Sequence, residues 1–235
     1  MQKRIVLAAD ELSVEQLLPL LKRVASRLYA VKIHDLYDEH GPQIVGWLKN
    51  YDVKVWVDAK LHDIPATVAR RATAFKKAGA DILSVHASGH VDMMMEAVAF
   101  GPEEIFAITV LTSLNETKTK SVYARSVQET VSDLAQMAGF FNGIKGIVCS
   151  PNELAYLKGH EDLDPHMKFV TPGIRSLGKD AHDQQRIATP GQAILNGSSL
   201  LVIGRQITQS KDPLHEIELI EAEIEQALLQ KGVWS

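Results

Sequence analysis

The sequence has 235 residues and a mass of 25.9 kDa, which is enough for one large domain with a full hydrophobic core. Hydrophobic residues make up 46% and charged residues 23%, which argues against a disordered, collagenous or disulfide-scaffold protein. The formal net charge of -4 provides no basic surface for the chain as a whole, so we predict that nucleic acid is not a partner.

The amino-terminal residues and the single cysteine predict where the protein works. The apolar run that begins at Ile5 ends at Asp10, too early for a secretion-signal core of about seven to fifteen residues. No uninterrupted apolar stretch reaches the length of about 18 residues that spans a membrane. Cys149 has no second cysteine with which to form a disulfide or a thiolate metal cluster. We therefore predict a cytoplasmic protein with no membrane partner.

Short apolar, β-branched runs recur along the chain and predict strands. There are about eight of them: IVLAA near residue 5, YAVKI near 29, VKVWVDA near 53, ILSVHA near 82, IFAITVL near 105, GIVCS near 146, KFVTPG near 168 and LLVIG near 200. Segments with helical spacing of apolar residues lie between them, as in residues 14–24. Between Leu111 and Gly146 the polar run NETKTKS predicts an extended loop before its helix.

Strand and helix alternate throughout, which favours one particular architecture. Eight strands, each followed by a helix, in a chain near the usual 250 residues or so match an α/β fold of the (β/α)8 TIM barrel type. A doubly wound open sheet is the structural alternative. Because no linker-like or low-complexity tract interrupts the pattern, we predict a single domain over residues 1–235.

Functional groups follow almost every predicted strand. They are Asp10, Lys32, Asp58 with Lys60, His86, Thr112, Ser150, Gly173 with Arg175, and Gly204 with Arg205. Active sites of such barrels lie at the carboxyl ends of the strands. Loops are commonly polar, so each position is weak by itself, but their joint placement predicts a site at that mouth.

The densest group of charges is DAKLHDIP, which begins at Asp58. Residues two apart on a strand point to the same face, so Asp58 and Lys60 should project together into the mouth while Ala59 faces the helices. With Lys32, and with Asp63 in the turn, they could form an array of two ammonium groups and two carboxylates. A salt-bridge network at the rim is the alternative, but paired charges in a mouth that excludes water are costly and favour function.

Two later loops, TPGIR and IGRQIT, predict a phosphate-binding site. Loops after the seventh and eighth strands commonly bind phosphate in this fold. Gly173 and Gly204 allow close approach of the backbone, and Arg205 supplies a fork of donors. Arg175 alone could equally be an ordinary surface arginine, but the two loops together favour phosphate.

The histidines do not predict a metal site. His86 and His90 stand four apart, but the residues between them are loop-like rather than helical, so zinc is not expected. His34 and His62 lie beside the charged residues. We expect these two side chains to support the array through hydrogen bonds rather than to titrate in catalysis.

These residues resemble the orotidine 5'-phosphate decarboxylase family. DAKLHDIPATV is similar to the family's Asp-x-Lys-x-x-Asp-Ile-Pro signature, and the resemblance continues through SVHAS, TVLTS, VCSP, VTPGIR, DQQRIATP and VIGRQITQS. It covers nearly the whole chain in order. The resemblance implies decarboxylation of orotidine 5'-phosphate to uridine 5'-phosphate and CO2 in pyrimidine biosynthesis, with no cofactor and no metal.

The resemblance also implies roles for individual residues. Lys32, Asp58, Lys60 and Asp63 match the charged catalytic array, with Lys60 as the proton donor to C6 of the pyrimidine. A homodimer is implied, in which Asp63, Ile64 and Thr67 reach the neighbouring site. The matching substrate-binding positions are Asp10 and Lys32 for the ribose, Thr112 for the pyrimidine, Gln184, Gly204 and Arg205 for the phosphate, and Arg175 beside the lid.

Two other functions remain open from the sequence. A magnesium-dependent sugar-phosphate enzyme of the same barrel superfamily, such as a ketogulonate-phosphate decarboxylase or a hexulose-phosphate synthase, shares the Asp-x-Lys-x-x-Asp core. The Ile-Pro continuation, the TVLTS segment and the DQ pair favour the nucleotide decarboxylases over it. A non-catalytic sensor of nucleotide phosphates would keep Gln184 and Arg205 but would have no need of Lys60.

Overall fold

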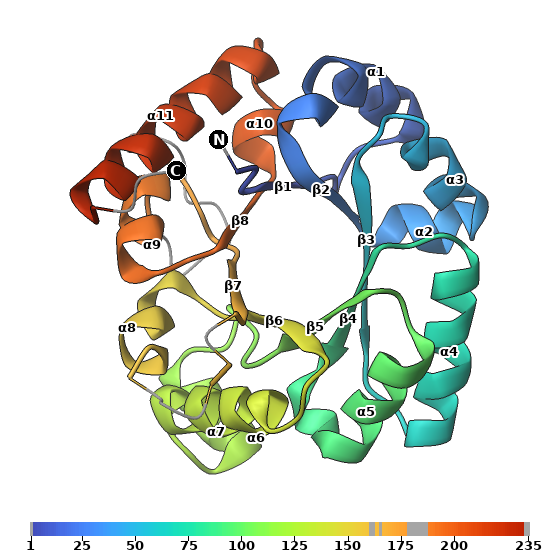
Figure 1. Cartoon of the computed structure of the whole chain (residues 1–235), viewed down its shortest axis with the longest axis vertical. Coiled ribbons are helices and arrows are strands. Elements are labelled where there is room, and N and C mark those ends of the chain that lie inside the picture. The colour runs from blue at the N-terminus through green and yellow to red at the C-terminus, as the bar shows by residue number, and fades with distance from the viewer. Residues whose placement is uncertain (1, 160–162, 165, 178–187, 233–235) are drawn as a thin grey trace.

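The computed structural model describes residues 2–159, 163–164, 166–177 and 188–232. Eight parallel strands form a closed barrel in the order of the chain (Figure 1). They are β1 (Ile5–Ala8), β2 (Leu28–Ile33), β3 (Lys54–Leu61), β4 (Ile82–His86), β5 (Glu104–Ile108), β6 (Ile144–Val148), β7 (Lys168–Thr171) and β8 (Leu200–Ile203). The eight predicted strands and the TIM barrel are therefore confirmed, and the open sheet is excluded.

Helices surround the strands in Figure 1. They are α1 (Val14–Val24), α2 (Asp35–His40), α3 (Gln43–Lys49), α4 (Pro65–Lys77), α5 (His90–Phe100), α6 (Glu116–Tyr123), α7 (Val127–Gly139), α8 (Leu154–Leu157), α9 (Pro190–Asn196), α10 (Arg205–Thr208) and α11 (Pro213–Gln230). Within the described residues, none of the helices is both long enough and apolar enough to cross a membrane.

The expectation of an extended loop at NETKTKS is wrong. Most of this run lies in α6, and the helix begins there because Asn115 caps it. The Asn115 side-chain oxygen accepts a hydrogen bond from the backbone N–H of Lys118 at 3.0 Å, which satisfies one donor of the first turn. The polar composition of the run reflects an exposed helix rather than an irregular loop.

The strands are buried on both faces because successive side chains point alternately outward and inward. Outward residues such as Leu7 and Val31 pack against the helices, and the inward layer includes Val6, Trp56 and Phe106. The Trp56 and Phe106 rings meet edge to face, with their centroids 5.1 Å apart. The barrel interior is therefore a packed core that supports its carboxyl-terminal mouth from below.

A charged cluster closes the opposite, amino-terminal end of the barrel. Glu104 begins β5 and accepts hydrogen bonds from Lys168 Nζ at 2.6 Å and from the Tyr29 hydroxyl at 2.7 and 2.8 Å. Lys54, the first residue of β3, forms an ion pair with the same carboxylate. Burial by itself would raise the pKa of Glu104, but the hydrogen bonds from Lys168, Lys54 and Tyr29 outweigh it and lower that pKa.

Replacing Glu104 with glutamine should lower the free energy of unfolding by about 2 kcal/mol at pH 7, the range for hydrogen bonds to a charged group. A carboxylate whose pKa is lowered by folding stabilises the protein above its unfolded pKa, and the contribution disappears as the pH falls through the folded value. Urea unfolding should therefore show the difference between wild type and Glu104→Gln narrowing below about pH 4. An equal difference at pH 7 and at acidic pH would contradict this role of the charge.

Candidate active site

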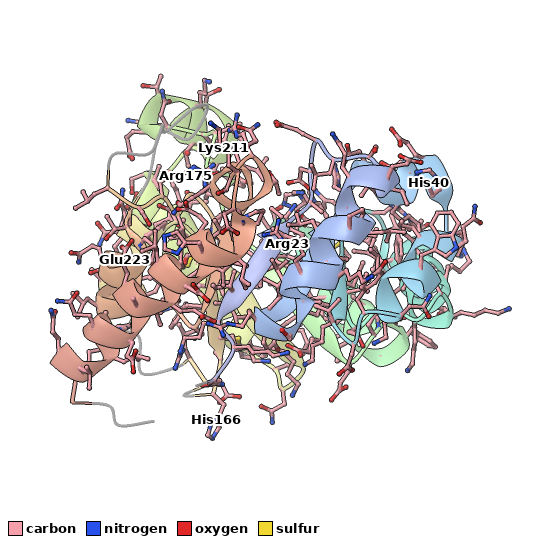
Figure 2. All side chains as sticks on the ribbon, turned by 90° about the horizontal axis from the view of Figure 1, so that it is seen from above. Arg23, His40, His166, Arg175, Lys211 and Glu223 are labelled. Carbon is pink, nitrogen blue, oxygen red and sulfur yellow. The ribbon has the colours of Figure 1, made fainter. Side chains whose placement is uncertain are left out.

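A cavity opens at the carboxyl-terminal end of the barrel. Its polar lining consists of Asp10, Glu11, Lys32, Asp58, Lys60, Thr112, Arg175 and Arg205, with Gly173 and Gly204 beside the arginines. In the side view of Figure 2, Arg175 lies toward the upper end of the molecule, and His166, which precedes β7, lies at the lower end. All of these residues except Glu11 were among the predicted strand-end residues, so their gathering at one mouth is confirmed. His86 and Ser150 were predicted with them but do not line this cavity.

The charged side chains alternate in sign across the mouth. Lys32 Nζ lies 2.8 Å from Asp10 Oδ2 and 3.3 Å from Asp58 Oδ2. Lys60 Nζ lies 2.7 Å from the same Asp58 oxygen. The chain of contacts is therefore Asp10, Lys32, Asp58, Lys60, and we refer to these four residues as the charged array. Ala59 packs against the outer apolar layer, as its place on the strand predicts.

Within one chain, the second carboxylate of the array is Asp10 and not Asp63. Asp63 is exposed in the turn after β3, where its carboxylate accepts the backbone N–H of Ile64 at 2.7 Å. Ile64 is 66% exposed and Thr67 lies on the first turn of α4, so neither lines the cavity. The turn leads outward from the barrel, and the expectation that these residues complete a neighbouring site stays a prediction.

Burial and opposite charges set the ionisation of Asp58 and Lys32. Burial would raise the pKa of Asp58, but Lys32 and Lys60 outweigh it and hold that pKa at about 2. Burial likewise would lower the pKa of Lys32, yet the carboxylates of Asp58 and Asp10 raise it overall. At neutral pH Asp58 and Lys32 are therefore a carboxylate and an ammonium group in contact.

The histidines beside the array differ in what they contact. His34 Nδ1 lies 2.8 Å from the backbone oxygen of Asp58, so the predicted support by hydrogen bonding is confirmed for His34. Within the described residues His62 makes no such bond, and its ring packs against His86 with centroids 5.5 Å apart. Across this part of the chain, no group of three or more His, Cys, Asp or Glu side chains is placed to hold a metal ion.

Two arginines converge on the far side of the cavity. Arg175 is only 8% exposed, and its Nη1 donates to the backbone oxygen of Ile174 at 2.6 Å. Its Nε is buried without a hydrogen-bond partner among the described atoms. Burial and then the charge of Arg205 lower the pKa of Arg175. Two neighbouring guanidinium groups with an unused donor favour an anion at this position.

The glycines let the backbone come close beside these arginines. Gly173 has a positive φ of 74°, which side-chain-bearing residues rarely adopt. A Cβ on Gly204 would lie 3.3 Å from the backbone oxygen of Ala8, tighter than most real contacts. Gln184, the other predicted phosphate ligand, lies outside the described residues.

Comparison with known proteins places this geometry in a family. The model of the Orotidine 5'-phosphate decarboxylase / HUMPS family matches residues 3–220. The chain belongs to this family. It is 39% identical to the orotidine 5'-phosphate decarboxylase of Pseudoalteromonas translucida, covering 95% of this chain and 97% of the relative. The crystal structure of orotidine 5'-phosphate decarboxylase from Lactobacillus acidophilus superposes with a TM-score of 0.80 at 31% identity, covering 95% of this chain and 99% of that one.

Several apolar residues that line the cavity of this family member were not identified from the sequence. Trp56, Ile108, Val110, Val148 and Val202 form an apolar wall of the cavity next to the charged array. Four of them lie on strands and Val110 follows β5, and these positions were the available signal, but apolar residues there are ordinarily core.

Ser84 was also missed. It is fully buried beneath Asp58 and donates a hydrogen bond to Asp58 Oδ1 at 2.6 Å. It lies on β4, two residues before His86, and alternation predicts the same face for both.

Proposed function

We propose that this protein decarboxylates orotidine 5'-phosphate to uridine 5'-phosphate and CO2 in pyrimidine biosynthesis. The observation that carries the proposal is the alternating charged array at one side of a cavity whose other side holds Arg175 and Arg205. A nucleotide would lie with its base at the array and its phosphate at the arginines. Asp10 and Lys32 would hold the ribose and Thr112 the pyrimidine, with Gln184 as a further phosphate ligand. The names of the relatives support this assignment.

The proposed chemistry depends on the two ammonium groups. The bond between C6 and the carboxylate breaks, CO2 leaves, and the electron pair stays on C6 as an sp2 carbanion that the ring does not delocalise. Cations held in place before the reaction stabilise such a charge more than they stabilise the substrate. Lys60 then donates a proton from Nζ to C6 and regains one from water. No cofactor or metal takes part in this scheme, so the expected cofactor content is none.

Asp58 would act on the carboxylate that leaves. Its ionised side chain would face the substrate carboxylate, and that repulsion disappears as neutral CO2 forms. Two charges about 4 Å apart at an effective dielectric constant of about 20 interact by about 4 kcal/mol. Enzymatic rate enhancements correspond to about 8 to 23 kcal/mol, so stabilisation of the carbanion and binding energy from the phosphate must supply the remainder.

We also propose how the chain assembles. Residues 1–235 act as one catalytic domain in a cytoplasmic homodimer, and Asp63, Ile64 and Thr67 reach the site of the partner subunit. The exposure of Asp63 and Ile64, only a few residues after Lys60, supports this arrangement because the turn is accessible to a second chain. A site completed in this way has the Asp63 carboxylate of the partner subunit in addition to the charged array of its own chain.

The test of the proposed function is the ultraviolet absorbance change of EDTA-treated protein with orotidine 5'-phosphate, with the product identified by mass. Formation of uridine 5'-phosphate in the absence of metal is the expected result. A folded, dimeric protein that leaves the nucleotide unchanged would overturn the proposal. Restoration of activity by magnesium with sugar phosphates would then favour the magnesium-dependent branch of the barrel superfamily.

Arg205 provides a prediction specific to the phosphate. Arg205→Ala should lower kcat/KM for orotidine 5'-phosphate by about 10²- to 10³-fold, because one charge-assisted contact is worth about 1.5–3 kcal/mol and phosphate binding energy also lowers the barrier. Turnover of the bare nucleoside orotidine should be unaffected, and this is the internal control. Equal losses on both substrates would contradict the phosphate assignment.

A further inference from the structure

The end of β3 contains a bulge at the charged array. Val57 pairs with Leu83 and Leu61 pairs with Val85, so three residues of β3 lie opposite a single residue of β4, which is Ser84. Bulges bend a strand and redirect its side chains, and they are frequent beside active sites. The three bulged residues begin with Asp58 and end with Lys60. The bulge therefore contains two residues of the charged array, Asp58 and Lys60.

Lys60 has a backbone conformation that needs support. Its φ is +46°, in the left-handed region that side-chain-bearing residues rarely adopt and that costs on the order of 1 kcal/mol. Such a conformation persists only where surrounding contacts hold it. The backbone N–H of Lys60 donates to the Ser84 hydroxyl oxygen at 3.1 Å. Ser84 thus anchors the strained residue directly.

The same hydroxyl also contacts the neighbouring carboxylate. Ser84 Oγ donates its proton to Asp58 Oδ1 at 2.6 Å, while Asp58 Oδ2 receives Lys60 Nζ at 2.7 Å and Lys32 Nζ at 3.3 Å. One carboxylate oxygen is therefore occupied by Ser84 and the other by the two lysines. Because Ser84 is fully buried, water cannot replace its hydroxyl without a rearrangement.

We propose that Ser84 is a positioning residue that holds both ends of the bulge, fixing the Asp58 carboxylate and the backbone of Lys60 so that the Lys60 ammonium group points at the reacting carbon. This inference rests on the proposed function for its catalytic consequence. The hydroxyl does not line the cavity and so does not touch the substrate. Its effect should appear in the chemical step, because small misplacements of a catalytic group are costly.

The first experiment measures turnover of Ser84→Ala. We expect kcat for orotidine 5'-phosphate to fall about 10- to 100-fold, the effect of one or two lost buried hydrogen bonds to a charged group, with KM changed less than about threefold. Ser198→Ala is the matched control. Ser198 is also a buried serine whose hydroxyl is hydrogen-bonded, at 3.0 Å to the backbone oxygen of Leu200, but it precedes β8 at the other end of the barrel. It should lose stability without losing kcat.

The second experiment tests the hydrogen bond between the Lys60 N–H and Ser84 in the absence of substrate. Amide hydrogen exchange by NMR should show that the Lys60 N–H exchanges at least about tenfold faster in Ser84→Ala than in wild type, because the substitution removes the Ser84 hydroxyl that accepts its hydrogen bond. The amides of Val55 and Leu83, elsewhere on β3 and β4, should keep their protection. An unchanged exchange rate at Lys60 would contradict the claim that Ser84 holds the Lys60 backbone, whatever the activity of the variant.

The two experiments separate the inference from the proposed function. Faster exchange at Lys60 with an unchanged kcat in an active enzyme would overturn the positioning role. A wild-type protein that does not act on orotidine 5'-phosphate would overturn the proposed function and the catalytic consequence of Ser84 together. In that case the exchange measurement would still show whether Ser84 holds the bulge.

Discussion

Lys60→Ala is expected to lower kcat for orotidine 5'-phosphate by at least about 10⁴-fold, because it removes both a proton donor and a cation at the carbanion. The substitution leaves Asp58 paired with Lys32, whose Nζ lies 3.3 Å away, so the buried carboxylate keeps one partner and the fold should survive. Binding of uridine 5'-phosphate should remain measurable, because Arg175 and Arg205 are untouched. Absorbance assays and calorimetric titration with the product measure the two effects separately.

The barrel itself offers a matched control for Lys60. Lys54 begins the same strand, is also ion-paired, and lies at the amino-terminal end of the barrel against Glu104. Lys54→Ala should cost some stability and leave kcat unchanged. If Lys60→Ala turned over at the wild-type rate, Lys60 would not be the proton donor.

Mixed dimers should restore activity to two variants that are each nearly inactive. In a dimer of one Lys60→Ala subunit and one Asp63→Ala subunit, one site combines both changes and the other has neither, if Asp63 serves the partner's site. Random reassociation of equal amounts should recover roughly a quarter of the wild-type sites, since half of the dimers are mixed. The rate of the mixture relative to each variant alone is the measurement.

The control pair for this complementation is Lys60→Ala with Asp58→Ala. These two side chains belong to one chain and are in direct contact, with Lys60 Nζ 2.7 Å from Asp58 Oδ2. Every site of their mixed dimer lacks one of them, so no recovery is expected. Recovery by this pair, or none by the pair with Asp63 in dimers verified by mass, would contradict a site shared in the proposed way.

Acidic pH should affect the two ends of the barrel differently. The pKa of Asp58 is held at about 2 by Lys32 and Lys60, so its ionised form is present throughout the pH range in which the protein would be assayed. Glu104 also has a lowered pKa, and its contribution is one to stability rather than to the reaction. Acid at about pH 4 should thus weaken the closed amino-terminal end while Asp58 stays ionised.

The sequence by itself determined the architecture and the end of it that carries the chemistry. Eight β-branched runs with helical segments between them predict the barrel, because parallel strands buried on both faces must be apolar throughout. The alternation of side chains placed Asp58 and Lys60 on one face. The loops TPGIR and IGRQIT pointed to the arginines. Each of these inferences uses only local periodicity and the rule that places barrel sites at strand ends.

Only the tertiary structure decided which charges meet. Asp63 lies three residues from Lys60 in the sequence, yet it is Asp10, just after β1, that contacts Lys32. This is because β1 and β2 are neighbours and the turn after β3 leads outward. In the sequence Ser84 looks like an ordinary strand residue. Its role depends on the register between β3 and β4, which makes the bulge. Contacts between strands are set by closure of the barrel, which periodicity along one chain segment does not encode.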